Sequence, residues 1–342
     1  MTRARRRLLA LGLGVLLVFV LLAIGNALAR SAGFGAGLVM DDVGVPASVG
    51  WRWLPGQHVD SPHGFPIDIN AQGLRDPDDV VIPKPEGVFR ILCVGDSFTF
   101  GIETPQDRAY PAMLEQILTD AVGGLTVEVW NAGVNGLNSC QEQAWLDHYG
   151  WALEPDLVTV GFVMNDVLPL PASSMPRWFP GRSWMLRYPL YHYLRFNLIN
   201  RWKLGGDDPQ ANQLRNLIKQ HQGHVETSPS SNEYAMRWWN RATECLGALA
   251  AQCRERDVPV ALIVFPSLPQ MLKPDPLPEP QEVLTGLAAE RGFILVDLLD
   301  RYAATGEPAL LESDKAHPSL IGHRIAAEEL ARALAAAGAL PR

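Results

Sequence analysis

From residue 88 onward, short continuous apolar runs alternate with longer segments in which apolar residues recur at helical spacing. Five apolar runs predict buried strands, at residues 89–94, 126–130, 157–163, 258–265 and 293–298. Five intervening segments predict helices, at residues 110–121, 141–148, 232–257, 280–291 and 318–337. Buried strands separated by helices predict an α/β fold, in which a central parallel sheet of about five strands is covered on both faces.

The first 30 residues have a different pattern, which predicts a transmembrane helix. Leu8–Ala29 is 22 residues long and uncharged, and as a helix it would extend roughly 33 Å, enough to cross the hydrocarbon core. Four arginines precede it, so we expect residues 1–30 to be a cytoplasmic stub and signal anchor, with the rest of the chain on the extracytoplasmic side, periplasmic or extracellular. The alternative is a secreted protein whose signal peptide is cleaved at Ala27-Leu28-Ala29.

Two further segments fall outside the strand–helix alternation. Residues 31–87 are rich in Gly, Pro and Asp, and predict a connector that wraps the domain, with an ordered turn at Asn70–Asp76. The α/β domain then spans residues 88–338 and contains an insertion at about 169–231, which is rich in aromatic and basic residues. Three interpretations of this insertion stay open: a cap packed on the domain, a lid over the substrate pocket, or a contact with the membrane interface.

Charge and cysteine content limit the partners that the chain can have. The formal net charge is −8, and because the first 30 residues carry five arginines and no acid, the remainder carries −13. Such a body lacks the cationic surface that nucleic-acid binding requires.

Cys93 in a predicted strand is interpreted as a small buried hydrophobe, whereas Cys245 and Cys253 lie too far apart on one predicted helix to pair with each other. The sequence leaves any disulfide undecided.

The first candidate for chemistry is Gly95-Asp96-Ser97, directly after a predicted buried strand. Functional residues of a parallel sheet lie in loops at the carboxyl ends of the strands. A serine in this position is exposed above the sheet edge, where a nucleophile meets its substrate. Gly-Asp-Ser is also a common turn tripeptide, so the motif gains weight only together with others.

The second candidate is the pair Asp314 and His317, three residues apart just before the last predicted helix. This spacing brings a carboxylate beside an imidazole, so that Asp314 holds one ring N–H while the other ring nitrogen accepts the Ser97 proton. An aspartate and a histidine near a helix start can equally serve as a cap and a surface group.

Hydrogen-bond donors for an oxyanion are the third requirement of acyl transfer. Gly133 follows the predicted strand 126–130 and can offer its backbone N–H, as can Ser97. Asn165 ends the next predicted strand and can donate from its side-chain amide, whereas Asp166 is expected to cap the backbone that follows it.

These blocks occur in order, each at the end of a predicted strand or before the last helix, and together they resemble the SGNH hydrolases, also called the GDSL esterase/lipase family. The Ser, Gly, Asn and Asp-x-x-His blocks match Ser97, Gly133, Asn165 and Asp314 with His317. The resemblance covers about residues 88–338. It implies a flavodoxin-like three-layer α/β/α sandwich and a metal-free, cofactor-free hydrolase whose usual substrates are esters or acetylated sugars. The expected activity is therefore that of an esterase or a carbohydrate O-deacetylase, acting on a small ester or an acylated glycan.

Other readings of the same residues remain open at the level of sequence. An O-acyltransferase acting on a cell-envelope glycan would use the same triad, and a non-catalytic binding protein could retain the fold. His221 and His224 have the spacing of half a metal site, although a solvated face is the expected interpretation. His323, in the last predicted helix, is expected to be a packing or surface residue.

Overall fold

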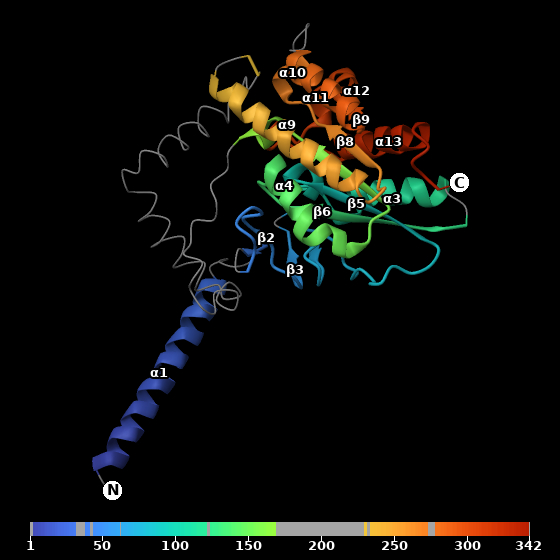
Figure 1. Ribbon diagram of the computed structural model, residues 1–342. Helices are drawn as coiled ribbons and strands as arrows, with labels where there is room; N and C mark the ends of the chain where they lie inside the picture. The colour runs from blue at the N-terminus through green and yellow to red at the C-terminus, as the bar shows by residue number, and fades with distance from the viewer. Residues whose placement is uncertain are drawn as a thin grey trace.

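The computed structural model describes residues 3–31, 38–41, 44–61, 63–121, 124–168, 229–230, 233–272 and 278–341. At its centre is a five-stranded sheet with the order β6-β5-β7-β8-β9, in which every pair is parallel (Figure 1). The strands are β5 (Val88–Gly95), β6 (Thr126–Gly133), β7 (Leu157–Phe162), β8 (Val260–Val264) and β9 (Ile294–Asp297). The predicted α/β fold with a parallel sheet of about five strands is confirmed.

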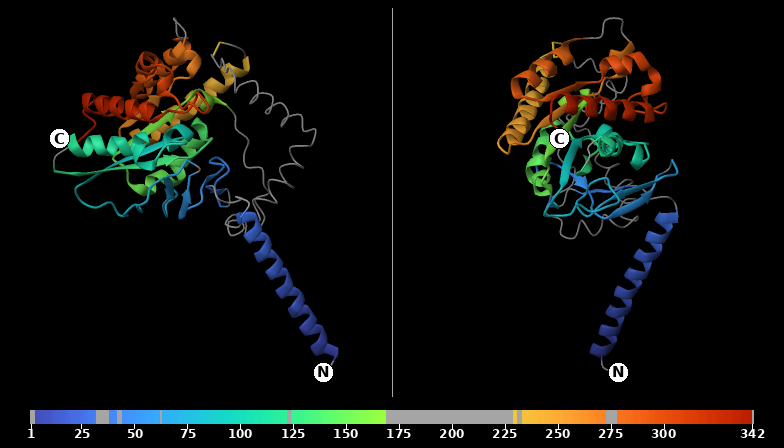
Figure 2. Two further views of the ribbon diagram at one scale, coloured as in Figure 1. Left: turned by 180° about the vertical axis from the view of Figure 1, so that it is seen from behind. Right: turned by 90° about the vertical axis from the view of Figure 1, so that its right-hand side faces the viewer.

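Helices cover both faces of the sheet. Successive side chains along each buried strand point to opposite faces, so each face contributes apolar side chains to its own core. Ile91 and Cys93 of β5 face a core shared with α3 (Tyr110–Ala121) and α13 (Leu320–Ala336), which pack against each other. The next residues along β5, Leu92 and Val94, belong to the opposite core. That core is shared with α4 (Ser139–Trp145), α9 (Glu233–Arg254) and α11 (Pro278–Arg291) (Figure 2).

The strand order places the carboxyl ends of β5 and β7 at a topological switch point. From β5 the chain adds β6 on one side, then returns to add β7, β8 and β9 on the other. In open parallel sheets the crevice outside such a point is where ligands bind. Ser97 follows β5 and Asn165 follows β7, so both lie at this crevice.

The connector contains two small antiparallel hairpins that the sequence pattern did not predict. One pairs β1 (Met40–Asp41) with β2 (Arg52–Trp53), and the other pairs β3 (Gln57–Asp60) with β4 (Pro66–Ile69). The expected turn at Asn70–Asp76 is present, and its first residue accepts hydrogen bonds from two backbone N–H groups farther along the turn. Buried connector side chains, including Trp53 and Leu74, belong to the same core as α4 and α9.

Several boundaries differ from those predicted. β6 continues three residues beyond the predicted end, because the backbone of Asn131–Gly133 pairs in register with Cys93–Gly95 of β5. The helix predicted at 141–148 is α4, followed by a single π-helical turn over Leu146–Gly150. Two short helices, α10 (Leu268–Leu272) and α12 (Leu299–Thr305), were not predicted. The insertion at about 169–231 lies outside the described residues except for 229–230.

The cysteines divide into one disulfide and two buried thiols. Cys140 of α4 is joined to Cys245 of α9, two helices that pack side by side over the same face of the sheet. Cys93 and Cys253 are free and buried, which confirms the interpretation of Cys93 as a small core residue.

The N-terminal segment forms one helix, α1 (Arg3–Ser31), and many of its described apolar side chains, from Leu13 to Leu28, are exposed. Within the described part of the chain, no helix combines the length and the apolar character needed to span a membrane. The transmembrane helix predicted over residues 8–29 is therefore not supported.

Candidate active site

The candidate nucleophile stands on a very short helix at the end of β5. Asp96 caps α2 (Ser97–Phe100), because its side-chain Oδ1 accepts a hydrogen bond of 2.8 Å from the backbone N–H of Phe98. Gly95 has no room for a side chain, since a Cβ there would lie 2.1 Å from Thr99 Oγ1. The sharp strand-to-helix turn thus depends on Gly95 and Asp96, and it leaves Ser97 at the carboxyl edge of the sheet.

Three side chains that the sequence placed in one site lie in a continuous hydrogen-bonded chain. Ser97 Oγ is 2.9 Å from His317 Nε2, although the two residues are 220 positions apart. His317 Nδ1 is 2.5 Å from Asp314 Oδ2. The other oxygen of Asp314 accepts hydrogen bonds from the backbone N–H groups of Ala316 and His317. The aspartate therefore fixes both the loop before α13 and the orientation of the imidazole.

The pKa of Asp314 is suited to holding His317 as a base. Partial burial by itself raises the pKa of Asp314, but the hydrogen bonds from the His317 ring and from two backbone N–H groups outweigh it. The net pKa of Asp314 is therefore below its ordinary value. Asp314 is then ionised at neutral pH and favours the tautomer in which His317 Nδ1 carries the proton. His317 Nε2 is left to accept a proton from Ser97.

The predicted oxyanion donors are not all placed as expected. Asn165 lies at the site, where its amide Nδ2 donates to Asp96 Oδ2 at 3.3 Å. Gly133, however, is the last residue of β6 rather than a loop residue, and its N–H donates to Asn131 Oδ1 at 3.0 Å. A Cβ on Gly133 would lie 2.2 Å from the backbone nitrogen of Phe100, so this glycine is required for close packing of β6 against α2.

Gly136 offers a different backbone donor in the loop after β6. It has a positive φ of 75°, and its N–H has no acceptor among the described residues. Strand pairing brings the ends of β6 and β5 together, so the loop after Gly133 leaves the sheet beside the Ser97 turn. The sequence drew attention to Gly133 because it stands closer to the predicted strand; the hydrogen bond from Gly133 to Asn131 could not be read from the pattern.

Buried carboxyl groups lie behind the nucleophile turn. Asp96, Glu142 and Asp166 are all almost fully buried, and neither oxygen of Glu142 has a hydrogen-bond partner among the described residues. Burial raises the pKa of Glu142 and Asp166 well above their ordinary values, and the charge of Asp96 raises both further. Asp166 accepts from the N–H of Val163, which precedes it, so the prediction that it caps the following backbone was wrong.

Glu142 and Arg75 are the polar residues near this site that the sequence analysis missed. For Glu142 a signal existed, because it is three and four positions before the buried Trp145 and Leu146 and therefore shares their helix face. For Arg75 the only signal was its membership of the Asn70–Asp76 turn. Predicted as a packing or surface residue, His323 is fully buried, and burial lowers its pKa to about 3.

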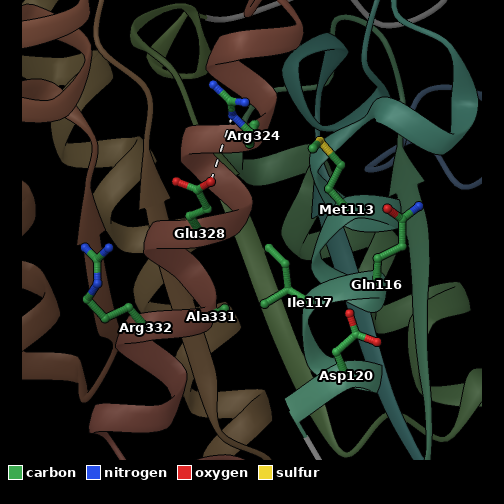
Figure 3. Close-up of a pocket in the computed structure, with 8 residues that line it drawn as sticks. All are labelled: Met113, Gln116, Ile117, Asp120, Arg324, Glu328, Ala331 and Arg332. Atoms are coloured by element: carbon green, nitrogen blue, oxygen red, sulfur yellow. Dashed lines mark ion pairs between the residues drawn. The ribbon is translucent and has the colours of Figure 1, made fainter.

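Other candidate sites gain no support. Within the described ranges no group of three or more His, Cys, Asp or Glu residues is arranged to hold a metal ion, and His221 and His224 lie outside those ranges. The pocket drawn in Figure 3 lies between α3 and α13, with Met113, Ile117 and Arg324 among its lining residues. It contains none of the predicted catalytic residues.

Several solved structures are similar to this chain at low sequence identity. Three similar solved structures are TesA, the acetylxylan esterase Axe2 from Geobacillus stearothermophilus, and LAE5, an alpha/beta hydrolase enzyme from the metagenome of Lake Arreo in Spain. They are 19%, 18% and 19% identical to this chain, with TM-scores of 0.45, 0.44 and 0.44. The matches cover 72%, 72% and 74% of this chain, and 97%, 94% and 97% of theirs.

No curated protein sequence gives a significant match to the chain. The sequence profile of the GDSL-like lipase/acylhydrolase family, in contrast, matches residues 93–325, which is more than half of the chain and runs from β5 into α13. The protein therefore belongs to the GDSL-like lipase/acylhydrolase family and is an ester-hydrolysing enzyme.

Proposed function

We propose that this enzyme cleaves carboxylic esters, either small esters or acylated glycans, with Ser97 as nucleophile, His317 as general base and Asp314 as orienting carboxylate. The observation that carries the proposal is the hydrogen-bonded chain, with 2.9 Å between Ser97 Oγ and His317 Nε2 and 2.5 Å between His317 Nδ1 and Asp314 Oδ2. These distances lie in the range in which a general base takes a proton directly from a nucleophile.

The steps follow from this geometry. Ser97 Oγ attacks the ester carbonyl carbon while His317 Nε2 takes the hydroxyl proton, and the imidazolium is stabilised by the Asp314 carboxylate. The tetrahedral intermediate expels the alcohol, which receives that proton from His317. Water then adds to the acyl-enzyme with His317 again acting as base, and the carboxylic acid leaves Ser97 free.

The oxyanion donors in this proposal are the N–H of Ser97, the side-chain amide of Asn165 and a backbone N–H after β6. Asn165 uses one of its two amide hydrogens on Asp96 and keeps the other for the substrate. For the third donor we favour Gly136 over the predicted Gly133, because the Gly133 N–H is already bonded to Asn131. Preorganised donors of this kind are worth more in the crevice than in water, since they need no reorientation during the reaction.

The test is hydrolysis of p-nitrophenyl esters of increasing acyl length, in parallel with acetate release from acetylated sugars. We expect S97A to abolish turnover of every substrate that the wild-type enzyme hydrolyses. S230A is the matched control, because Ser230 is an exposed serine bonded to Glu279 and should retain wild-type rates. Hydrolysis by S97A at the wild-type rate would reject the proposal.

We further propose that the catalytic domain works in an oxidising compartment outside the cytoplasm. The disulfide between Cys140 and Cys245 supports this location, because such bonds persist in exported proteins and are rare in the cytosol. The arginine-flanked apolar segment at the N-terminus supports export as well. Protease treatment of spheroplasts, in which the periplasmic face is accessible, tests it: digestion of the domain only after the cytoplasmic membrane is lysed would contradict export.

A further inference from the structure

The helix that presents Ser97 is held by side chains from outside it. α2 has only four residues, so most of its carbonyl groups lack the partners that a longer helix would provide. Asn131 Nδ2 donates to Thr99 O at 2.9 Å and to Phe100 O at 3.2 Å. The guanidinium of Arg75 donates to Phe100 O as well, and to Gly101 O at 2.8 Å and Thr104 O at 2.6 Å.

Arg75 is an unusual residue for this purpose. Its side chain is 1% exposed, and its recorded acceptors are all backbone carbonyls; no carboxylate of the described residues lies within ion-pairing distance. Its guanidinium also lies over the ring of Phe100, 4.6 Å from the centroid. Burial lowers the pKa of Arg75 to about 10, which still leaves it charged at neutral pH. A buried cation is costly, and here it is compensated by the carbonyls at the end of α2 and beyond it, and by the face of the Phe100 ring.

The same connector also holds the other side of the crevice. Trp53 Nε1 donates to Gly133 O at 2.9 Å, and Trp51 Nε1 donates to Asn135 O at 3.0 Å. The ring of Trp53 is 4.8 Å from that of Phe100, so it contacts both α2 and the end of β6. Residues 51–75 precede the stretch that matches the family, which begins at residue 93. The end of α2 and the loop after β6 are thus each bonded in part by residues from outside that stretch.

We propose that Arg75 is a positioning residue, which fixes Ser97 against His317 through the carbonyls at the end of α2, and that Trp53 acts with it on the neighbouring loop. The inference rests on the proposed function, because it assumes Ser97 as nucleophile. Lysine cannot replace Arg75, since a single ammonium lacks the planar fork that reaches three carbonyls at once. Without the clamp α2 can shift, and a displacement of about 1 Å at a reacting atom costs on the order of 100-fold in rate.

The test compares R75K with R90K. Arg90 is a matched control because it is fully buried and also makes several hydrogen bonds, to Glu128 Oε2, Leu153 O and Val81 O. It lies near the amino end of β5, far along the strand from α2. For each variant we would measure the melting temperature, kcat and KM for p-nitrophenyl acetate, and the rate constant for labelling of Ser97 by a fluorophosphonate. All rates are taken well below the lower melting temperature.

We expect both variants to melt earlier, but only R75K to lose roughly 10- to 100-fold in kcat and in labelling rate, with KM within about twofold of wild type. Wild-type kcat in folded R75K, or equal losses in R75K and R90K, would overturn the inference. If R75K does not fold, W53F removes the N–H that bonds Gly133 O together with part of the buried indole ring, and an unchanged kcat there would overturn the inference instead. If S97A is as active as wild type, the proposed function itself has failed.

Discussion

Replacing Glu142 by glutamine should change how the stability of the protein depends on pH. Glu142 is fully buried, neither of its oxygens has a hydrogen-bond partner among the described residues, and Asp96 lies close enough to repel its charge. Burial therefore raises its pKa well above the ordinary value of 4.5. At a pH between the ordinary pKa and the raised one, Glu142 is a neutral carboxylic acid in the folded protein, while in the unfolded chain it is ionised.

The size of the effect follows from proton linkage. Above pH 4.5 the unfolded chain releases the Glu142 proton and the folded protein keeps it, so the free energy of unfolding falls as the pH rises. The loss is about 1.4 kcal/mol per pH unit, until the pH reaches the raised pKa of the folded state. Over the pH range between these two pKa values the free energy of unfolding of the wild-type protein should therefore fall by about 1.4 kcal/mol per pH unit more than that of E142Q, in which this group no longer titrates.

Urea unfolding at pH 5.5, 6.5 and 7.5, followed by tryptophan fluorescence with the disulfide intact, measures this difference. Glutamine has nearly the shape of the protonated acid, so any packing cost shifts the E142Q curve by a constant and leaves its slope with pH unaffected. Asp96 and Asp166 are present in both proteins, so their own titration contributes to both curves. Parallel dependence on pH in the two proteins would refute the reasoning, because it would mean that Glu142 is ionised in the folded state.

Three further changes have defined outcomes. D314A, assayed well below its melting temperature, should lower kcat about 10³- to 10⁴-fold, because His317 loses its orienting partner; a kcat within tenfold of wild type would argue against the triad. N165A should lower kcat by about 10²- to 10³-fold in the same ester assay, and an unaffected kcat would remove Asn165 from the oxyanion site. The double variant C140S/C245S, which opens a disulfide between residues 105 positions apart, should lose about 2–5 kcal/mol in urea unfolding. Equal stability would show that packing of α4 on α9 suffices.

The sequence pattern predicted best the helices and strands whose boundaries are set by their own apolar spacing rather than by distant contacts. α3 occupies the predicted residues 110–121, because its apolar spacing is regular and Gly124 follows closely. β5, β7 and β8 were found because they are largely buried and most of their residues are apolar. β6 was cut short because Asn131 and Gly133 have low strand propensity, and only pairing with β5 keeps them extended.

Long-range contacts decided what the pattern could not predict. The triad was identified because its spacing and order resemble a known family, but the placement of the Gly133 N–H depends on a hydrogen bond to Asn131. The disulfide depends on the packing of α4 beside α9. Arg75 and Glu142 belong to residue types that usually face solvent, and tertiary packing buries them. Such burial is recognisable only after the chain has folded.

The most direct test of the central claim is covalent labelling of the native enzyme by a fluorophosphonate, followed by mass spectrometry of its peptides. We expect one adduct, on Ser97, formed in the folded protein and not in urea, and slowed by at least about 100-fold in H317Q because the base is lost. An adduct on another residue, or equal labelling rates in wild type and H317Q, would contradict the assignment of Ser97 as a nucleophile activated by His317.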